Sequence, residues 1–239
     1  RALPRAAPRR PMATRSNPTM TTHPATFTTI LLPIFASLLP HTPLRILDLF
    51  AGTGKIALLH AWLPNTRFFG AELEPEWSAM ANTAGCPTPI CSATNLPYPT
   101  STFDALITSP CYGNRMADHH NARDASPRHT YRHVLGRPLH TLNAGALQWG
   151  DAYRALHAAA WTEARRVLRP GGILVLNVKD HIRGGIIQRV TNWHAVTLLG
   201  LGFVCTTRVH VPCPGQRHGA NSQLRLAYES VLGFELVSA

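Results

Sequence analysis

The chain has 239 residues, of which 45% are apolar and 15% are charged. This composition excludes a wholly disordered, collagen-like or disulfide-scaffold protein, and the length suits a single domain. Lys and Arg total 23 against 12 Asp and Glu, a formal net charge of +11. Such a balance indicates a polyanionic partner, either nucleic acid or an acidic membrane surface. Codon bias is the alternative explanation, because 21 of the 23 basic residues are arginine.

The cysteine pattern supports neither a disulfide framework nor a zinc site, because the number is odd and no CxxC is present. We therefore predict no metal and a reducing, cytoplasmic compartment. The apolar stretch at 27–40 is too short to span a membrane and contains Pro33, so we predict no membrane partner. The five cysteines are Cys86, Cys91, Cys111, Cys205 and Cys213.

Residues 1–22 hold five Arg, four Pro and no acidic residue, which predicts a disordered basic tail. The rest of the chain, 23–239, reads as one α/β domain. Helices are predicted at 55–63, from 74, at 151–168 and at 190–202, with a turn at the Arg-Pro-Gly-Gly of 169–172. Apolar strands are predicted at 44–50, 66–73, near 89–92, 102–110, 173–180, 203–211 and 226–237.

Alternating strands and helices imply a doubly wound, mostly parallel, seven-stranded sheet with a Rossmann-like arrangement. The last two strands are joined by a loop too short for a crossover helix, so they form an antiparallel C-terminal hairpin. Residues 113–150 hold five Arg, five His and two acidic residues. We expect this excursion to be a solvated substrate loop that contacts phosphates and covers the active site.

A glycine-containing turn, DLFAGTG at 48–54, joins the first strand to the first helix. Gly52 and Gly54 let the backbone approach a ligand at the carboxyl edge of the sheet, where doubly wound folds bind nucleotides. Glu72 ends the second strand about 20 residues later, the position from which an acid bonds ribose hydroxyls. A G-x-G alone is a weak signal for a nucleotide-binding site. No lysine–serine or lysine–threonine pair follows it, so the loop lacks the motif of a nucleoside triphosphate site.

Taken with GAELEP at 70–75, RPGG before a strand and the closing hairpin, this motif resembles the class I S-adenosylmethionine-dependent methyltransferases. The resemblance implies S-adenosyl-L-methionine as cofactor, with Asp48, Phe50, Gly52 and Gly54 on its methionine side and Glu72 on its ribose. HPATF at 23–27 resembles the amino-terminal cofactor segment of DNA amino-methyltransferases. The implied cofactor-binding set is Phe27, Asp48, Phe50, Ala51, Gly52, Thr53, Gly54, Glu72, Leu73, Ser92 and Ala93. Ser92 stands where the family often has an acid for the adenine.

TSPCYGNR at 108–115 resembles the Asp/Asn/Ser-Pro-Pro-Tyr motif of enzymes that methylate exocyclic base nitrogens, and its surroundings look like small phage and actinobacterial DNA methylases. The implied catalytic residues are Ser109, Pro110 and Tyr112: two accept the hydrogens of the amine, and the tyrosine stacks on a flipped base. The implied substrate is double-stranded DNA, with N4 of cytosine ahead of N6 of adenine. We expect substrate contacts from Arg115, Asn177, Lys179 and Arg217.

Three alternatives stay open at this point. An RNA methyltransferase acting on N2 of guanine uses a similar motif. Cytosine-5 methylation would use Cys111 as nucleophile, although a Glu-Asn-Val motif is replaced here by Leu176-Asn177-Val178. A non-catalytic nucleic-acid-binding remnant would explain Ser92 and Cys111. The chain has no room for a large recognition domain, so either the target sequence is short or recognition is shared within a homodimer. The sequence does not indicate a restriction partner.

Overall fold

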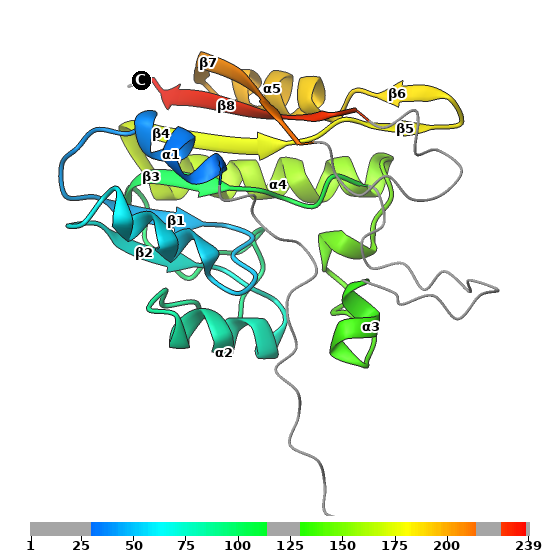
Figure 1. The fold of residues 1–239 in the computed structure, drawn as a ribbon, viewed down its shortest axis with the longest axis horizontal. Helices are drawn as coiled ribbons and strands as arrows, with labels where there is room; N and C mark the ends of the chain where they lie inside the picture. Colours follow the sequence, from blue (N-terminus) through cyan, green and yellow to red (C-terminus); the bar gives the residue numbers. More distant parts are fainter. Residues whose placement is uncertain (1–29, 114–129, 214–225, 238–239) are drawn as a thin grey trace, which may run out of the picture.

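The computed structural model describes residues 30–113, 130–213 and 226–237. A six-stranded sheet forms the centre of the fold (Figure 1). β1 to β4 run parallel, and β8 runs against both of its neighbours, β4 and β7. The predicted α/β fold with one reversed strand is therefore confirmed. In spatial order the strands are β2 (Arg67–Gly70), β1 (Arg45–Asp48), β3 (Phe103–Thr108), β4 (Leu168–Val178), β8 (Tyr228–Leu236) and β7 (Phe203–Pro212).

The expected seventh strand near 89–92 is reduced to one bridge between Glu72 and Ile90. The N–H groups of Gly70 and Glu72 donate to the carbonyls of Pro87 and Pro89. In a continued parallel ladder, the donor to the Gly70 carbonyl would be Pro89, which has no N–H. The Tyr98 hydroxyl donates to that carbonyl instead, at 3.0 Å. Proline chemistry thus explains why the sheet has six strands in place of seven.

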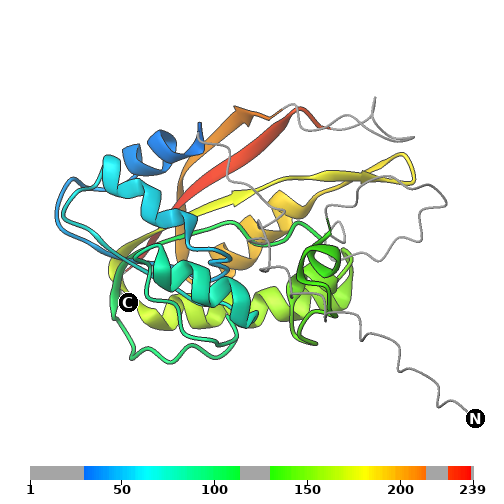
Figure 2. The same cartoon turned by 60° about the horizontal axis from the view of Figure 1, so that its bottom comes forward.

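Helices cover both faces of the sheet (Figure 2), and an apolar layer lies on each face. α1 (Leu31–Ser37) and η1 (Lys55–Ala61) pack on one face through Phe35 and Leu59, and α4 (Asp151–Val167) and α5 (Val190–Gly200) pack on the other through Trp161 and Leu198. Alternate residues of β4 enter the two layers, as the period of a strand buried on both faces requires. Each large side chain buried in this way contributes roughly 1.5–3 kcal/mol.

Local differences from the sequence-based prediction concern helix type and strand length. Residues 55–61 form a 3₁₀-helix in place of the expected α-helix. The Arg-Pro-Gly-Gly predicted as a turn lies inside β4, opposite a register shift in β3 between Phe103 and Ala105. Gly171 has a φ of 71°, which is accessible to glycine at such an irregularity.

Two segments end up differently from what the sequence suggested. Residues 130–150, predicted to be part of a solvated loop, contain α3 (Tyr131–Leu135) and η2 (Ala144–Ala146) and bury Tyr131 and Asn143. Residues 181–188, for which no element was predicted, form a separate hairpin of β5 (His181–Arg183) and β6 (Ile186–Gln188). α2 (Pro75–Thr83) lies at the β2 edge (Figure 1). None of the helices in the described ranges is long and apolar enough to cross a membrane.

Candidate functional site

A cavity of about 800 Å³ opens where β1 to β4 end. It brings together most of the residues singled out in the sequence, from loops that are far apart along the chain. Asp48 and Gly54 are buried and are not among the residues that line it, while Phe27, Arg115, Arg217 and the 1–22 tail lie outside the described residues. The predicted residues that line it are Phe50, Ala51, Gly52, Thr53, Glu72, Leu73, Ser92, Ala93, Ser109, Pro110, Tyr112, Asn177 and Lys179.

The turn after β1 supports one end of the cavity. Gly54 has a φ of 73°, and a Cβ added there would lie 2.8 Å from the Cβ of Ala81, so only glycine fits. Asp48 is buried, and its Oδ1 accepts from the Phe50 N–H at 3.0 Å and from the Thr108 hydroxyl at 2.7 Å. Burial nevertheless raises the pKa of Asp48 to about 6. Its Oδ2 is buried without a partner among the described residues, which is typical of a site that receives a polar ligand.

Glu72 reaches the same turn from the end of β2. Its carboxylate accepts the Gly52 N–H at 2.9 Å and the Leu73 and Glu74 N–H groups at 2.8 Å each. These bonds favour the charged form, but burial outweighs them and raises the pKa of Glu72 to about 7. The acid is held rigidly at the cavity wall and retains lone pairs for further hydrogen bonds.

The predicted catalytic residues meet at the other end of the cavity. The Ser109 and Tyr112 hydroxyls lie 3.0 Å apart. Asn177, at the end of β4, places its Nδ2 3.3 Å from the Ser109 hydroxyl, 3.0 Å from the Tyr112 hydroxyl and 2.9 Å from Oε2 of Glu229. An amide has two hydrogens for these three acceptors, so one bond must be shared or exchanged.

Glu229 is a cavity residue that the sequence analysis missed. It lies near the start of β8, and because β8 is the reversed strand, its beginning lies at the edge where the parallel strands end. The expected reversal of this strand was the available signal: it makes a polar residue near the start of the last strand a candidate. Oε1 of Glu229 also accepts from the Cys213 thiol at 3.4 Å.

Buried side chains of α4 and α5 hold the backbone of the predicted catalytic motif in place. Trp161 Nε1–H donates to Nδ1 of His194 at 3.0 Å, so the hydrogen of the neutral imidazole lies on Nε2. That nitrogen is 2.9 Å from the Tyr153 hydroxyl, which in turn donates to the carbonyl of Cys111 at 2.6 Å. Burial lowers the pKa of His194 well below its usual value, which keeps the ring neutral. Helices α4 and α5 thus position the motif through Tyr153 and Trp161, whose side chains are fully buried.

Cys111 lies in a setting that keeps its thiol protonated. Burial raises the pKa of this thiol to about 11. Its sulfur lies 3.7 Å from the hydroxyl of Tyr131, a residue of the 130–150 segment. A nucleophilic cysteine needs the opposite environment, one that stabilises the thiolate.

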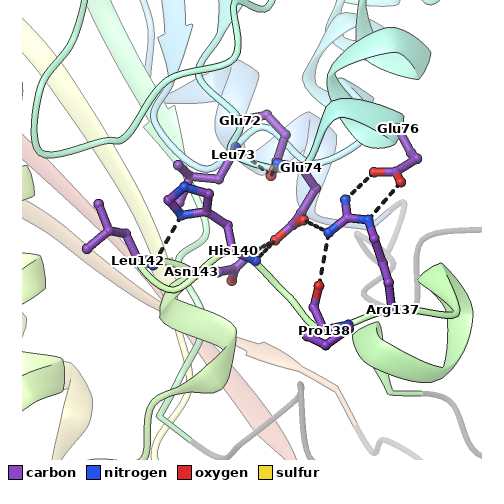
Figure 3. A network of polar contacts seen from close by, with 9 residues as sticks. All are labelled: Glu72, Leu73, Glu74, Glu76, Arg137, Pro138, His140, Leu142 and Asn143. Carbon is purple, nitrogen blue, oxygen red and sulfur yellow. Dashed lines mark hydrogen bonds and ion pairs between the residues drawn. The ribbon is translucent and has the colours of Figure 1, made fainter.

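Leu142, Asn143 and Ala144 line a further side of the cavity, which the sequence did not predict. Figure 3 shows the polar contacts that hold their segment in place. The fully buried carboxylate of Glu74 accepts from the His140 N–H at 2.9 Å and from Nδ2 of Asn143 at 2.8 Å. Arg137 forms ion pairs with Glu74, at 2.8 Å, and with Glu76. Arg137 is therefore paired with two carboxylates, and Arg115, the residue of the 113–150 excursion for which a substrate contact is predicted, lies outside the described residues.

Ser92, the departure at the adenine position, lines the cavity with its hydroxyl 2.8 Å from that of Thr94. Position 92 therefore offers a hydroxyl in place of the carboxylate that the family often has there. Among the described residues, no group of three or more His, Cys, Asp or Glu side chains is placed to hold a metal ion.

No protein-family model and no curated protein matches the sequence. Solved structures share its fold. The 1,6-didemethyltoxoflavin-N1-methyltransferase of Burkholderia thailandensis, solved with 1,6-didemethyltoxoflavin and S-adenosylhomocysteine, aligns over 88% of this chain and 78% of its own, with 16% identity and a TM-score of 0.54. An S-adenosylmethionine-dependent methyltransferase of Methanosarcina mazei aligns over 87% and 98%, with 15% identity and a TM-score of 0.57.

The same fold also carries other chemistry. The [4+2]-cyclase SpnF aligns over 88% of this chain and 82% of its own, with 16% identity and a TM-score of 0.57. At such identities the likeness concerns architecture, and function has to be argued from the site. The chain has the Rossmann-like fold found in S-adenosylmethionine-dependent methyltransferases.

Proposed function

We propose that this chain is an S-adenosylmethionine-dependent methyltransferase that acts on an exocyclic amino group of a base in double-stranded DNA, with N4 of cytosine ahead of N6 of adenine. One observation carries the proposal. The loop after β1 and Glu72 share a single cavity with Ser109, Pro110 and Tyr112. A cofactor-type site and an amine-type site thus face the same space.

The residues at the first end fit the cofactor. Glu72 supplies a rigid carboxylate for the ribose hydroxyls, and the turn at Gly52 lets the ligand approach the backbone closely. The unpartnered Oδ2 of Asp48 is a buried acceptor beside that turn. When bound, the cofactor supplies an electrophilic methyl group on a sulfonium.

The residues at the second end fit an amine. The nitrogen lone pair of a base amine is delocalised into the ring, so acceptors for its two hydrogens localise that lone pair. The Ser109 hydroxyl and the Pro110 carbonyl are the acceptors, and the neighbouring Asn177 and Tyr112 hold the hydroxyl in place. Burial raises the pKa of Tyr112 well above its usual value, so the phenol keeps its proton. Catalysis in such a site comes chiefly from positioning.

The environment of Cys111 favours this proposal over cytosine-5 methylation, which needs a thiolate at that position. The experiment is a product assay. Labelled S-adenosylmethionine is incubated with unmethylated duplex DNA or structured RNA, and the methylated nucleoside is identified by mass. N4-methylcytosine or N6-methyladenine in DNA supports the proposal. 5-Methylcytosine, a methylated guanine in RNA, or neither transfer nor cofactor binding contradicts it.

The catalytic assignment is tested with a Ser109→Ala, Tyr112→Ala double variant. We expect transfer to fall by at least about 100-fold because the amine is no longer held. Binding of S-adenosylmethionine, measured by calorimetry, should persist and shows that the variant folds. Ser37→Ala, an exposed serine of α1, is the matched control. An unchanged rate in the double variant overturns the assignment.

A further inference from the structure

The β5–β6 hairpin is a two-stranded ribbon that forms no ladder with the main sheet. Its turn consists of Gly184 and Gly185, whose φ values of 58° and 75° are those that a tight two-residue turn requires. His181, Ile182 and Arg183 line the cavity. The ribbon extends beyond the end of β4 (Figure 1), and the whole of β5, up to the residue before the turn, lines the cavity.

The tip of the hairpin is apolar and exposed. Ile186 is 67% exposed, the highest value among the large apolar side chains of the described residues, and Ile187 beside it is 49% exposed. The two side chains point to opposite faces of the ribbon, because Ile187 pairs with Ile182 and Ile186 with Arg183. Scattered exposed apolar residues are ordinary, but two adjacent ones at a projecting tip beside a cavity indicate a contact surface.

The exposed charges of the ribbon are positive. Arg183 lies at the tip, opposite Ile186, and Arg189 follows Gln188 at the base of the ribbon; both are exposed. Neither guanidinium has an ion-pair partner within the described ranges, whereas Arg137 and Arg166 are paired with carboxylates. This arrangement opposes self-association, because two tips in contact would bring two unpaired Arg183 guanidinium groups together. It suits a polyanion.

Resting on the function proposed above, we propose that the β5–β6 hairpin enters a groove of duplex DNA and that an isoleucine of its tip fills the space left in the base stack by the extruded target base. A two-stranded ribbon fits the major groove. Apolar wedges, isoleucine among them, are inserted between base steps by proteins that deform DNA. Arg183 at the tip and Arg189 at the base of the ribbon contact phosphates, and the cavity that β5 lines receives the flipped base.

The test compares two substrates built on the site that the wild-type enzyme is found to methylate. In one duplex the target base is normally paired, and in the other it faces an abasic position and is already unpaired. The Ile186→Ser, Ile187→Ser variant should lose about tenfold in kcat/KM on the paired duplex and less than about twofold on the unpaired one, because the cost of opening the pair is then absent. Val196→Ser, at a 58% exposed valine of α5 outside the cavity lining, should leave both rates unchanged.

Arg183→Ala supplies a second measurement. The slope of the logarithm of the DNA-binding constant against the logarithm of salt concentration should fall by about one for each phosphate contact removed. An equal loss on both duplexes, no loss on the paired duplex, or a change in oligomeric state of the isoleucine variant overturns the hairpin assignment while the proposed function stands. A wild-type enzyme that methylates only RNA, or nothing, overturns the proposed function and the DNA partner together.

Discussion

Glu72 combines two properties that oppose each other. It accepts three backbone hydrogen bonds as a carboxylate, yet burial raises its pKa to about 7. The residue is therefore close to half protonated at neutral pH, and a ligand that needs its carboxylate must bind the ionised fraction. That makes the strength of the cofactor site dependent on pH in the physiological range.

We predict that the Kd of S-adenosylmethionine rises roughly tenfold between pH 8 and pH 6, because the ionised fraction of Glu72 falls by about that factor. Glu72→Gln should bind more weakly at pH 8 and show little further change down to pH 6. Calorimetric titrations at several pH values measure both proteins. Asp48, whose pKa is about 6, is retained in each, so its contribution is shared. A wild-type Kd that is constant over this range contradicts the role given to Glu72.

His157 is a buried residue whose pKa is shifted downward, so it changes the pH dependence of stability in the direction opposite to Glu72. Its Nδ1 lies 2.8 Å from the Tyr153 carbonyl, its ring stacks on Phe50, and burial lowers its pKa to about 4. Between about pH 6.5 and pH 4 the unfolded chain therefore binds more protons at this position than the folded chain. Its contribution makes the free energy of unfolding fall as the pH falls through that window.

Replacement of the ring by one that cannot be protonated tests this. His157→Phe loses the bond to Tyr153 at every pH, at a cost of about 1 kcal/mol. Relative to wild type, the variant should regain on the order of 2 kcal/mol in free energy of unfolding between pH 7 and pH 4.5. Urea denaturation at each pH gives the difference, in which the effects of Glu72 and His194 largely cancel. A difference that does not change with pH contradicts the prediction.

At the scale of elements, the segment after the predicted catalytic motif is held to the start of α2 by Glu74 and Arg137 (Figure 3). A buried carboxylate that loses its cation is left with an unfavourable environment. Leu142, Asn143 and Ala144 line the cavity from this segment, so its attachment also shapes the site.

Arg137→Ala should lower the free energy of unfolding by roughly 1–3 kcal/mol, because Glu74 loses its cation while remaining buried. The affinity for S-adenosylmethionine should fall as well, since the cavity wall is released. Arg154→Ala is the matched control: it breaks an ion pair with the exposed Asp151 and a cation–π contact with Trp149, which together should cost about 1 kcal/mol or less and leave the affinity unchanged. Urea denaturation measures the change in stability, and calorimetry measures the change in affinity. Identical behaviour of the two variants contradicts the role given to Arg137 in stabilising the cavity wall.

For the whole molecule, the net charge of +11 predicts how DNA binding responds to salt. Binding to phosphates releases counterions, so the affinity for unspecific duplex DNA should fall by at least about 100-fold between 50 and 200 mM salt. Fluorescence anisotropy with a short labelled duplex measures the slope. A nearly flat salt dependence would instead fit an arginine content that reflects codon usage alone.

The features that the sequence determined by itself are local ones. The order of strands and helices follows from hydrophobic periodicity, and the reversed strand follows from the short connection before it. Gly54 and Glu72 were found because a tight turn and an acid at a strand end leave recognisable residues at fixed spacing. Ser109, Pro110 and Tyr112 were likewise found as one motif, and the structure brings them to the cavity of the cofactor loop.

Only the tertiary structure decided what depends on residues far apart along the chain. The Arg137–Glu76 contact joins positions 61 residues apart, and it helps to hold the segment whose Leu142, Asn143 and Ala144 line the cavity. The Asn177–Glu229 bond spans 52 residues, and Tyr98 takes the place of the hydrogen that Pro89 cannot donate. The physical reason is that backbone preferences act within a few residues and are visible in sequence. The partner of a buried charge is selected by which surfaces the folded chain brings together.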